Sequence, residues 1–270
     1  MRLVELSNKV ASVSSSLKEK DFLELLKTKY KNSYDAARKQ PIFGKLISKE
    51  DFLLINPSTS SRQSKFIIDG LTAHLNSWRN YADRTECVRG WTDQEIADNR
   101  GEGSVYLLIP IDHAHVYVAA GDNFYRSFAK ANKFLEVERL DNGALFSWYE
   151  SLWKVAKAVK LVSGNIPDFE TSKQFLKALE QLDKLHTKTK EISELENLEA
   201  IDLRRIESVL KLRKPLKDIL SIILDPDDNG IKSFSTLYNL TPNKEVWTSA
   251  KCIAVLYTEY EALYNRGIVK

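Results

Sequence analysis

The spacing of hydrophobic residues predicts helices at the start of the chain and in a long block near its middle. Residues 1–50 place apolar side chains three and four positions apart, the repeat of a helix with one buried face. Asp21 is the expected N-cap of the second of these helices, and Pro41 and Gly44 are expected to end the segment. Residues 145–224 repeat the pattern with acids early and Lys or Arg late in each stretch, as the helix dipole favours. We expect this block to pack as a small bundle.

Short apolar runs rich in β-branched and aromatic residues predict strands outside those helices. The clearest are SVYLLIPID and HVYVAAG, at 104–112 and 115–121, and FLLIN at 52–56 is another. Two further runs near the end of the chain also predict strands, EVW at 245–247 and CIAVLY at 252–257. Because strands must pair to satisfy their backbone groups, these last strands should rejoin the sheet formed earlier in the chain.

The order of these elements is helices, strands, a helical block and strands again, which is typical of an α+β protein. We expect an N-terminal helical segment over residues 1–50 and a core built from residues 51–144 and 225–270. The helical block at 145–224 is then an insertion that packs on this core.

Composition narrows the class of protein only slightly. The chain has 270 residues, of which 43% are hydrophobic and 29% charged, values of an ordinary soluble globular protein. A net charge of +3 is too small to indicate nucleic-acid binding by itself, and solvated Lys-rich faces explain it. The N-terminus lacks the apolar core of a secretory signal, and no apolar run reaches the roughly 18 residues of a membrane span. We therefore expect a soluble protein in a reducing compartment, without a membrane partner.

Cysteine and histidine placement indicates no metal site. The two cysteines, Cys87 and Cys252, lie far apart, and the four histidines are scattered. His113 and His115 are expected on one face of a strand, where a pocket-wall or surface role suits them better than metal binding. The acidic stretch at 225–236 resembles a calcium loop, but its twelfth position holds Thr236 in place of the bidentate Glu, so it predicts a turn.

No glycine-rich nucleotide loop, nucleophile elbow or zinc-protease motif occurs in the chain. What remains is a group of polar residues at the expected strand edges. An Arg can clamp a phosphate, a Ser or Thr hydroxyl can orient a ribose, and a carboxylate can stabilise an oxocarbenium-like centre. Cleavage of the bond between nicotinamide and ribose needs this combination, although each residue taken alone is better explained as a cap, a turn or a surface charge. The group is Arg62, Ser64, Arg84, Thr85, Thr92, Asp122 and Glu245.

An ordered series of short motifs resembles an ADP-ribosyltransferase-like domain found in bacteriophage-encoded proteins. The series is SSRQSKF, then WRNYADRTECVRGWT, then VYLLIPIDHAHVYVAAGDNFYRSF, and later DPDDNGIKSF and KEVWTSAKCIAV. The family pattern runs from Arg-x-Ser through a Trp, a Pro-x-Arg-Ser turn, a strand ending in Ser-Thr and a Val-Ile-Pro strand to Asp-x-Trp-x-Ser-Phe. The resemblance covers residues 50–130 and 225–257 and implies a split β-sandwich core.

The resemblance also implies roles for individual residues. Arg62 corresponds to the family's Arg, Thr92 with Thr85 upstream to its Ser-Thr strand, and Glu245 to its catalytic Glu. Asn243 stands two residues before the Glu, where transferases that modify protein side chains carry Gln or Glu. The expected activity is mono-ADP-ribosyl transfer from NAD, as substrate, to a host protein or nucleic acid. We then expect the protein in the host cytoplasm or associated with the virion.

Departures from the family pattern keep a second class of function open. Ala82 replaces a Pro, Phe124 replaces a Trp, and Arg89-Gly90-Trp91-Thr92 stands in place of the Ser-Thr doublet. The Arg of the first strand is missing from LLINP. The alternative is a catalytically degenerate relative that serves as a phage structural or host-protein-binding module, with Lys173–Lys217 as its binding surface. A third reading, a helical-bundle adaptor unrelated to transferases, requires that the strands do not form one sheet.

Overall fold

The computed structural model describes residues 13–57, 67–195, 199–235 and 240–269. Its contacts divide the chain into two compact units. The sheet unit comprises residues 1–61, 86–124 and 231–270, and the helical unit comprises residues 62–85 and 125–230. Each unit is therefore assembled from segments that are far apart in the sequence.

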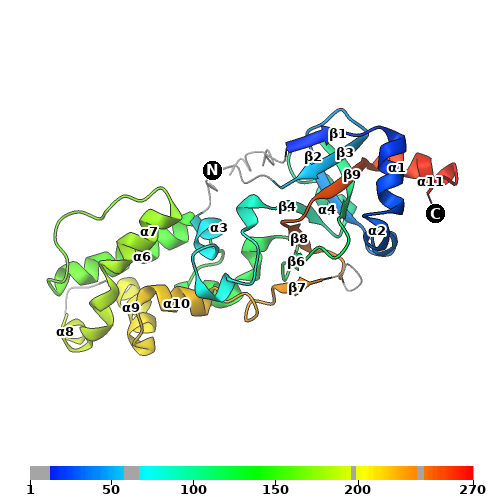
Figure 1. The fold of residues 1–270 in the computed structure, drawn as a ribbon. Helices are drawn as coiled ribbons and strands as arrows, with labels where there is room; N and C mark the ends of the chain where they lie inside the picture. The colour runs from blue at the N-terminus through cyan, green and yellow to red at the C-terminus, as the bar shows by residue number, and fades with distance from the viewer. Residues whose placement is uncertain (1–12, 58–66, 196–198, 236–239, 270) are drawn as a thin grey trace. The chain divides into compact units, whose positions relative to one another are not determined.

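All strands of the described parts of the chain join one open antiparallel sheet in the sheet unit, in the order β1-β3-β9-β5-β2-β4-β8-β6-β7 (Figure 1). The expectation that the C-terminal strands rejoin the earlier ones is confirmed, since β9 lies between β3 and β5. The adaptor reading was tied to strands that fail to form one sheet around Arg62 and Glu245; Glu245 belongs to this sheet, whereas Arg62 lies outside the described residues. The strands are β1 (Val13–Ser16), β2 (Ile42–Leu46), β3 (Phe52–Asn56), β4 (Val88–Trp91), β5 (Ser104–Pro110), β6 (Val116–Val118), β7 (Lys232–Phe234), β8 (Glu245–Thr248) and β9 (Cys252–Leu256).

Helices of the sheet unit cover one face of the strands β3, β9 and β5. Side chains alternate along a strand, so Leu107 and Ile109 of β5 point to this face while Tyr106 and Leu108 point to the other. Phe22 and Leu26 of α1 pack on this face. The helices of the unit are α1 (Glu19–Lys27), α2 (Lys31–Ala37), α4 (Gln94–Asp98) and α11 (Tyr257–Asn265).

The opposite face of the sheet has its own core, to which both ends of the strand order contribute. Leu53 of β3, Leu108 of β5, Val116 of β6 and Val246 of β8 belong to the same buried cluster. Strands this far apart in the order contribute to one core when a sheet is strongly curved.

The junction between β2 and β4 is narrow. Only Phe43 and Trp91 pair there, whereas β2 and β5 pair over five residues. A Cβ at Gly90 would lie 2.8 Å from the Phe43 carbonyl oxygen and 2.7 Å from a methyl carbon of Ile42. Glycine is therefore needed for β4 to approach β2 this closely.

The prediction of helices throughout residues 1–50 is wrong in two places. Ser14, Ser15 and Ser16 belong to the edge strand β1, paired with β3, and the segment around Gly44 is the central strand β2. The second helix predicted within residues 1–50, the one expected to begin at Asp21, is two helices, α1 and α2, interrupted around Thr28. Residues 1–12 of the first predicted helix lie outside the described residues.

Two local predictions also need correction. Asp21 lies inside the first turn of α1, whose N-cap is Lys18, so Asp21 favours the helix by its charge and not as a cap. His113 and His115 precede β6 and do not share a strand face, because His113 has a left-handed φ of 64° in a turn. The predicted turn at Asp225–Gly230 is present, although Thr236 lies outside the described residues.

The helical unit contains the helices predicted over residues 145–224, in shorter pieces than the spacing indicated. Its longest helix, α6, begins at the cap Asp141, whose carboxylate accepts the Ala144 amide, and buries Trp148, Tyr149, Leu152 and Trp153. The elements are α3 (Ile67–Thr72), η1 (Asn76–Trp78), η2 (Arg84–Glu86), η3 (Phe124–Ser127), α5 (Ala129–Leu135), α6 (Asn142–Ala158), α7 (Ser172–Glu180), η4 (Asp183–Thr187), α8 (Thr189–Ser193), α9 (Ala200–Leu212) and α10 (Leu216–Ile223), with η2 and η3 at unit boundaries.

Candidate functional site

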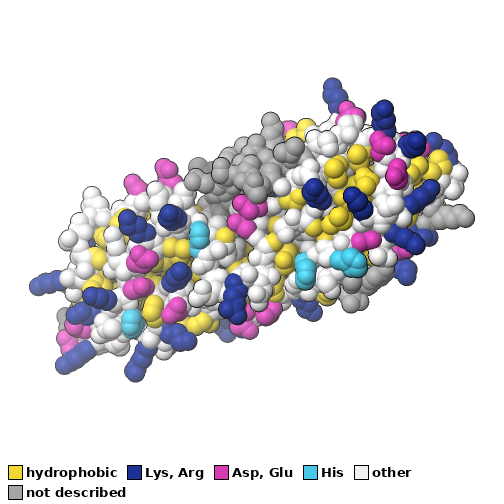
Figure 2. Space-filling model, in the orientation of Figure 1, with side chains coloured by type: hydrophobic (Ala, Val, Ile, Leu, Met, Phe, Trp, Pro, Cys, Tyr) yellow, Lys and Arg dark blue, Asp and Glu magenta, His cyan; other side chains and the backbone are white. Residues whose placement is uncertain are grey.

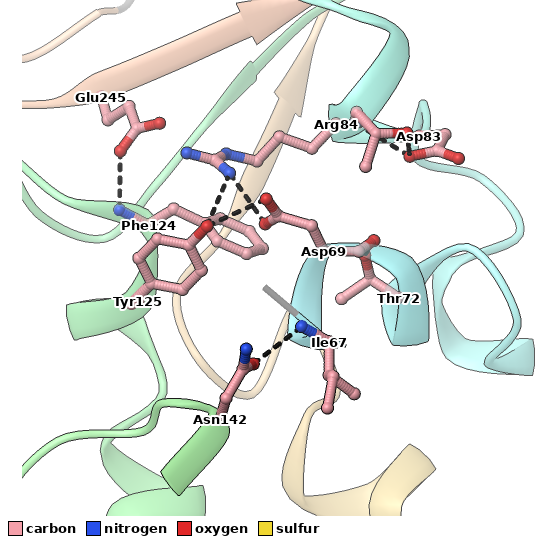
Figure 3. Close-up of polar contacts among 10 residues, drawn as sticks. Ile67, Asp69, Thr72, Asp83, Arg84, Phe124, Tyr125, Asn142 and Glu245 are labelled. Atoms are coloured by element: carbon pink, nitrogen blue, oxygen red, sulfur yellow. Dashed lines mark hydrogen bonds and ion pairs between the residues drawn. The ribbon is translucent and has the colours of Figure 1, made fainter. Parts of the chain in front are cut away.

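Glu245 opens β8 as a buried carboxylate. Its side chain is 4% exposed, and its Oε2 accepts a hydrogen bond of 2.8 Å from the backbone N–H of Phe124 (Figure 3). The backbone of Glu245 is held on both sides, because it pairs with Trp91 of β4 and exchanges hydrogen bonds with Ala119 and Gly121. The carboxylate is therefore fixed in position by the segment that follows β6.

The face of β8 that carries Glu245 is aromatic. Alternation along the strand puts Val246 in the core cluster and Glu245 with Trp247 on the other face. The Trp247 ring stacks on Tyr117 at 5.8 Å between ring centroids and meets Phe124 edge-on at 5.5 Å. Removal of water by these rings strengthens any charge interaction that the carboxylate makes.

Thr92 lies directly beside the start of β8. Its N–H donates to the Lys244 carbonyl at 2.9 Å. Its hydroxyl donates to the Thr241 carbonyl at 2.8 Å and accepts from the Lys244 N–H at 3.0 Å. Thr92 therefore lies next to Glu245, and its hydroxyl fixes the turn that precedes Glu245. Asn243 in this turn has a left-handed φ of 58°, a conformation that Asn tolerates.

Asp122 joins the same neighbourhood through residues that the sequence analysis did not select. The Trp91 indole N–H donates to the Asp122 carbonyl at 3.1 Å. The Arg100 guanidinium donates to that carbonyl and to the Asp122 carboxylate, both at 3.2 Å. The guanidinium carbon also lies 5.9 Å from the centre of the Trp91 ring, within the range of a cation–π contact.

Local chain geometry explains how Arg100 reaches this position. Asp93 caps α4 by accepting the Ile96 N–H at 3.0 Å, which turns the chain into a helix directly after β4. Arg100 follows the end of that helix, and its N–H bonds the Ala97 carbonyl. Arg100 belongs to no hydrophobic repeat and to no recognised motif. The only signal in the sequence that could have selected it is its place eight positions after Thr92.

Arg84 lies in the helical unit, within a buried polar network. Its guanidinium donates to the Asp69 carboxylate at 2.8 Å, and the two side chains are 4% and 6% exposed. The Tyr125 hydroxyl donates to the other Asp69 oxygen at 2.9 Å, and the guanidinium carbon lies 5.3 Å from the centre of the Tyr125 ring (Figure 3). Because the Arg84 guanidinium already donates to the Asp69 carboxylate, it is not arranged as an exposed Arg that binds a phosphate would be.

Of the remaining predicted site residues, one makes a local hydrogen bond and two lie outside the described residues. Thr85 donates its hydroxyl to the Asp83 carboxylate at 2.7 Å and lies in the helical unit beside Arg84. Arg62 and Ser64 lie outside the described residues. The structure thus brings Thr92, Asp122 and Glu245 together within the sheet unit, while Arg84 and Thr85 belong to the helical unit.

Other chemistry is sparse in the described parts of the chain. There, no three His, Cys, Asp or Glu side chains gather as metal ligands would, and no helix is both long and apolar enough to cross a membrane. Cys87 and Cys252 are buried and form no disulfide, and burial, followed by the nearby Cys87, raises the pKa of the Cys252 thiol.

Comparison with known protein families, with curated proteins and with solved structures finds no match to this chain. Its function must be argued from its own residues. The neighbourhood of Glu245 can hold one fixed negative charge among aromatic rings, beside a rigid turn and a cation that Asp122 neutralises. This arrangement suits the stabilisation of a transient positive charge.

Proposed function

We propose that the protein transfers ADP-ribose from NAD to a macromolecular acceptor, with Glu245 as the catalytic carboxylate. The observation that carries the proposal is the pairing of β4 with β8, which sets Thr92 against the start of β8. Thr92 and Glu245 are two of the positions that the resemblance to phage ADP-ribosyltransferase-like domains singles out. They are far apart in the sequence, since Thr92 and Lys244, the residue before Glu245, are separated by 152 positions.

The reaction breaks the bond between nicotinamide and the ribose of NAD. Nicotinamide leaves with the bonding electron pair, and positive charge develops on the ribose carbon and ring oxygen. The Glu245 carboxylate, already held by the Phe124 amide, would stabilise this charge without reorganising. An acceptor nucleophile then forms the new bond to the ribose carbon and gives up its proton.

The other proposed roles follow the same assignment. Thr92 supports the site of the nicotinamide ribose by fixing the turn before Glu245, and Asp122 borders it. Arg62 and Ser64 are proposed to bind the NAD phosphates. Arg84 and Thr85 are weaker candidates for contact with NAD, because Asp69 and Asp83 already accept their hydrogen bonds.

The finer fold assignment is also a proposal. We infer a split β-sandwich within the sheet unit, in which the strands on either side of the β2–β4 junction form two layers. The single Phe43–Trp91 pair at that junction supports this, as does the shared core cluster that combines β3 and β5 with β6 and β8.

The test measures thermal stability and nicotinamide release with millimolar NAD. A ligand that binds only the folded state raises the melting temperature by mass action. We expect a rise for the wild type, and loss of nicotinamide release in Glu245→Gln, whose amide oxygen can still accept the Phe124 N–H. Glu102→Gln is the matched control, since Glu102 is exposed on the same unit. Unchanged turnover in Glu245→Gln would reject the mechanism.

A second candidate function is a catalytically silent relative that binds a host or virion protein. The burial of Glu245 to 4% exposure favours it, as does the absence of an Arg from β3, whose sequence is FLLIN. The helical region Lys173–Lys217 would be its contact surface. On the face drawn in Figure 2, Lys and Arg side chains are interspersed with Asp and Glu, a pattern that suits a protein partner better than nucleic acid. No stability change with NAD and no nicotinamide release would favour this function.

A further inference from the structure

The segment between β6 and η3 contacts Glu245, the candidate catalytic residue. It also contacts the side chains of Trp91, Arg100 and Lys244, to which the proposed reaction assigns no role. It contains Gly121 and Asp122 and leads directly into Phe124, the first residue of η3. At one end the Phe124 N–H binds the Glu245 carboxylate, and the Gly121 carbonyl accepts the Glu245 N–H at 2.9 Å. Any displacement of this segment must therefore move the partner of the carboxylate.

The same segment is held from the other side at Asp122. The Asp122 carbonyl accepts two donors, the Trp91 indole N–H at 3.1 Å and the Arg100 guanidinium at 3.2 Å. The guanidinium adds a charge-assisted bond to the Asp122 carboxylate, with side-chain exposures of 22% for Arg100 and 31% for Asp122. Partial burial makes this pair less screened by solvent than a fully exposed ion pair.

A further contact comes from the turn before β8. The Lys244 ammonium donates to the Ala120 carbonyl, so the residue next to Glu245 also binds the segment. Trp91 itself pairs with Glu245 across β4 and β8. The contacts thus form a closed path from Trp91 through Asp122 and Phe124 to Glu245 and back to Trp91.

We propose that Arg100 and Trp91 act as positioning residues that hold the Glu245 carboxylate in its orientation through Asp122 and the Phe124 amide. Two donors on one backbone carbonyl fix the segment only two residues from the amide that binds the carboxylate. Arg100 has a second function in this arrangement, because its stacking on the indole keeps the Trp91 N–H directed at Asp122. The catalytic consequence rests on the proposed function, whereas the positioning itself is a property of the folded chain.

The experiment combines amide NMR with NAD kinetics in Arg100→Gln and Trp91→Phe. Trp91→Phe removes the indole N–H donor and keeps an aromatic ring. The NMR signal that is missing from this variant is therefore that of the Trp91 indole N–H. We expect both variants to change the Phe124 amide shift and to speed its hydrogen exchange by about tenfold or more. Turnover should fall by roughly tenfold to a hundredfold with little change in KM for NAD, since geometry and not binding is altered. Arg100→Lys, which keeps the charge, should lie between wild type and Arg100→Gln.

Arg38→Gln is the control, because Arg38 is an exposed arginine of the same unit paired with Asp35. Wild-type Phe124 amide shift and exchange in both Arg100→Gln and Trp91→Phe would overturn the positioning inference, even if turnover fell. If the wild type releases no nicotinamide, the proposed transfer fails, and the Phe124 amide still decides whether Arg100 and Trp91 position Glu245. If Glu245→Gln loses turnover and the Arg100 and Trp91 variants keep it, transfer stands and the catalytic consequence is rejected.

Discussion

At the scale of single residues, Asp69 and Arg84 form a deeply buried ion pair. Both side chains are almost fully excluded from solvent, and Tyr125 completes the network. Removal of one partner of a buried pair leaves a charge with too little compensation, which costs more than the pair itself contributes. The network therefore specifies the packing of the helical unit more than it adds net stability.

We expect Asp69→Asn to lower the free energy of unfolding by about 3 kcal/mol, the lower end of the range for breaking buried pairs. Chemical denaturation monitored by tryptophan fluorescence measures it. Glu207→Gln is the matched control, since Glu207 and its partner Lys211 are 64% and 76% exposed, and it should change stability by well under about 1 kcal/mol. Equal effects of the two substitutions would show that burial of the Asp69 pair is energetically unimportant.

Asp183 predicts a dependence of stability on pH. Burial raises the pKa of its carboxyl, and the hydrogen bond from the Leu216 N–H only partly opposes this. A raised folded-state pKa means that the protonated form favours folding, so this contribution is present below the unfolded pKa and is lost as pH rises through the folded pKa. At neutral pH the charged carboxylate is therefore unfavourable.

Asp183→Asn should consequently be more stable than the wild type at pH 7. The difference should disappear near pH 3, below the ordinary Asp pKa of about 3.9, where the wild-type carboxyl is also neutral. The amide oxygen of Asn can still accept the Leu216 N–H. Urea unfolding midpoints of both proteins across this pH range provide the measurement, and a less stable Asn variant at pH 7 would contradict the prediction.

Sequence reasoning at this scale selects Glu245, Thr92 and Asp122 but misses Trp91 and Arg100, which hold Asp122. The strand that Glu245 opens could be predicted, because EVW is a strand-like run that follows the breaker-rich turn LTPNK, whereas the role of Glu245 came from the family resemblance. Arg100 could not be predicted, since its role depends on the contact with Asp122 across 22 positions and on the stacking with Trp91. Arg84 was selected for its charge, but its burial against Asp69 depends on tertiary packing that local sequence does not encode.

At the scale of elements, α3 and α7 approach each other closely at Gly70. A Cβ at this position would lie 2.5 Å from the Ser172 hydroxyl oxygen and 2.9 Å from the Ser172 Cβ. Helix propensity alone would make Gly→Ala stabilising by about 1 kcal/mol. The contact should reverse that sign, because overpacking typically costs about 1–3 kcal/mol.

Gly70→Ala should therefore destabilise the protein, and it should do so less in a Ser172→Gly background. A double-mutant cycle by urea unfolding isolates the contact, since each single variant carries its own propensity effect. Additive effects of the two substitutions would show that the helices move apart without cost.

Element prediction succeeded where periodicity was long and failed where strands were polar or interrupted. The helices of 145–224 carried enough turns for the spacing to predict helix, although the structure divides them into shorter pieces. The strand β1 contains three serines, so it has no apolar alternation, and β2 contains Gly44, which resembles a breaker. The pairing of β4 with β8 could not be read from sequence, because nothing local specifies which distant strand completes an edge.

At the scale of the whole molecule, each unit has its own buried core although the chain passes between units several times. The helical unit takes residues 62–85 from one part of the chain and 125–230 from another. Trp78 links these two segments by donating its indole N–H to the Leu224 carbonyl at 2.7 Å. Cooperative stability is therefore expected to follow the units and not the order of the sequence.

Segment-resolved hydrogen exchange tests this organisation. Asp69→Asn should speed exchange in the peptides of 67–85 and 125–230, and leave the amides of β5 and β9 near their wild-type rates. Glu207→Gln again serves as the control. Uniform acceleration over the whole chain would show that the molecule opens as one cooperative body.

The two buried thiols have a practical consequence for spectroscopy. Cys87 and Cys252 are shielded within the sheet unit, and burial keeps the Cys252 thiol protonated at ordinary pH. Alkylating reagents and thiol-reactive dyes should consequently not react with the two cysteines of the folded protein under mild conditions. The unaltered protein is a natural blank for site-directed labelling, in which a cysteine placed at exposed Lys49 and another at exposed Lys184 would carry the only reporters.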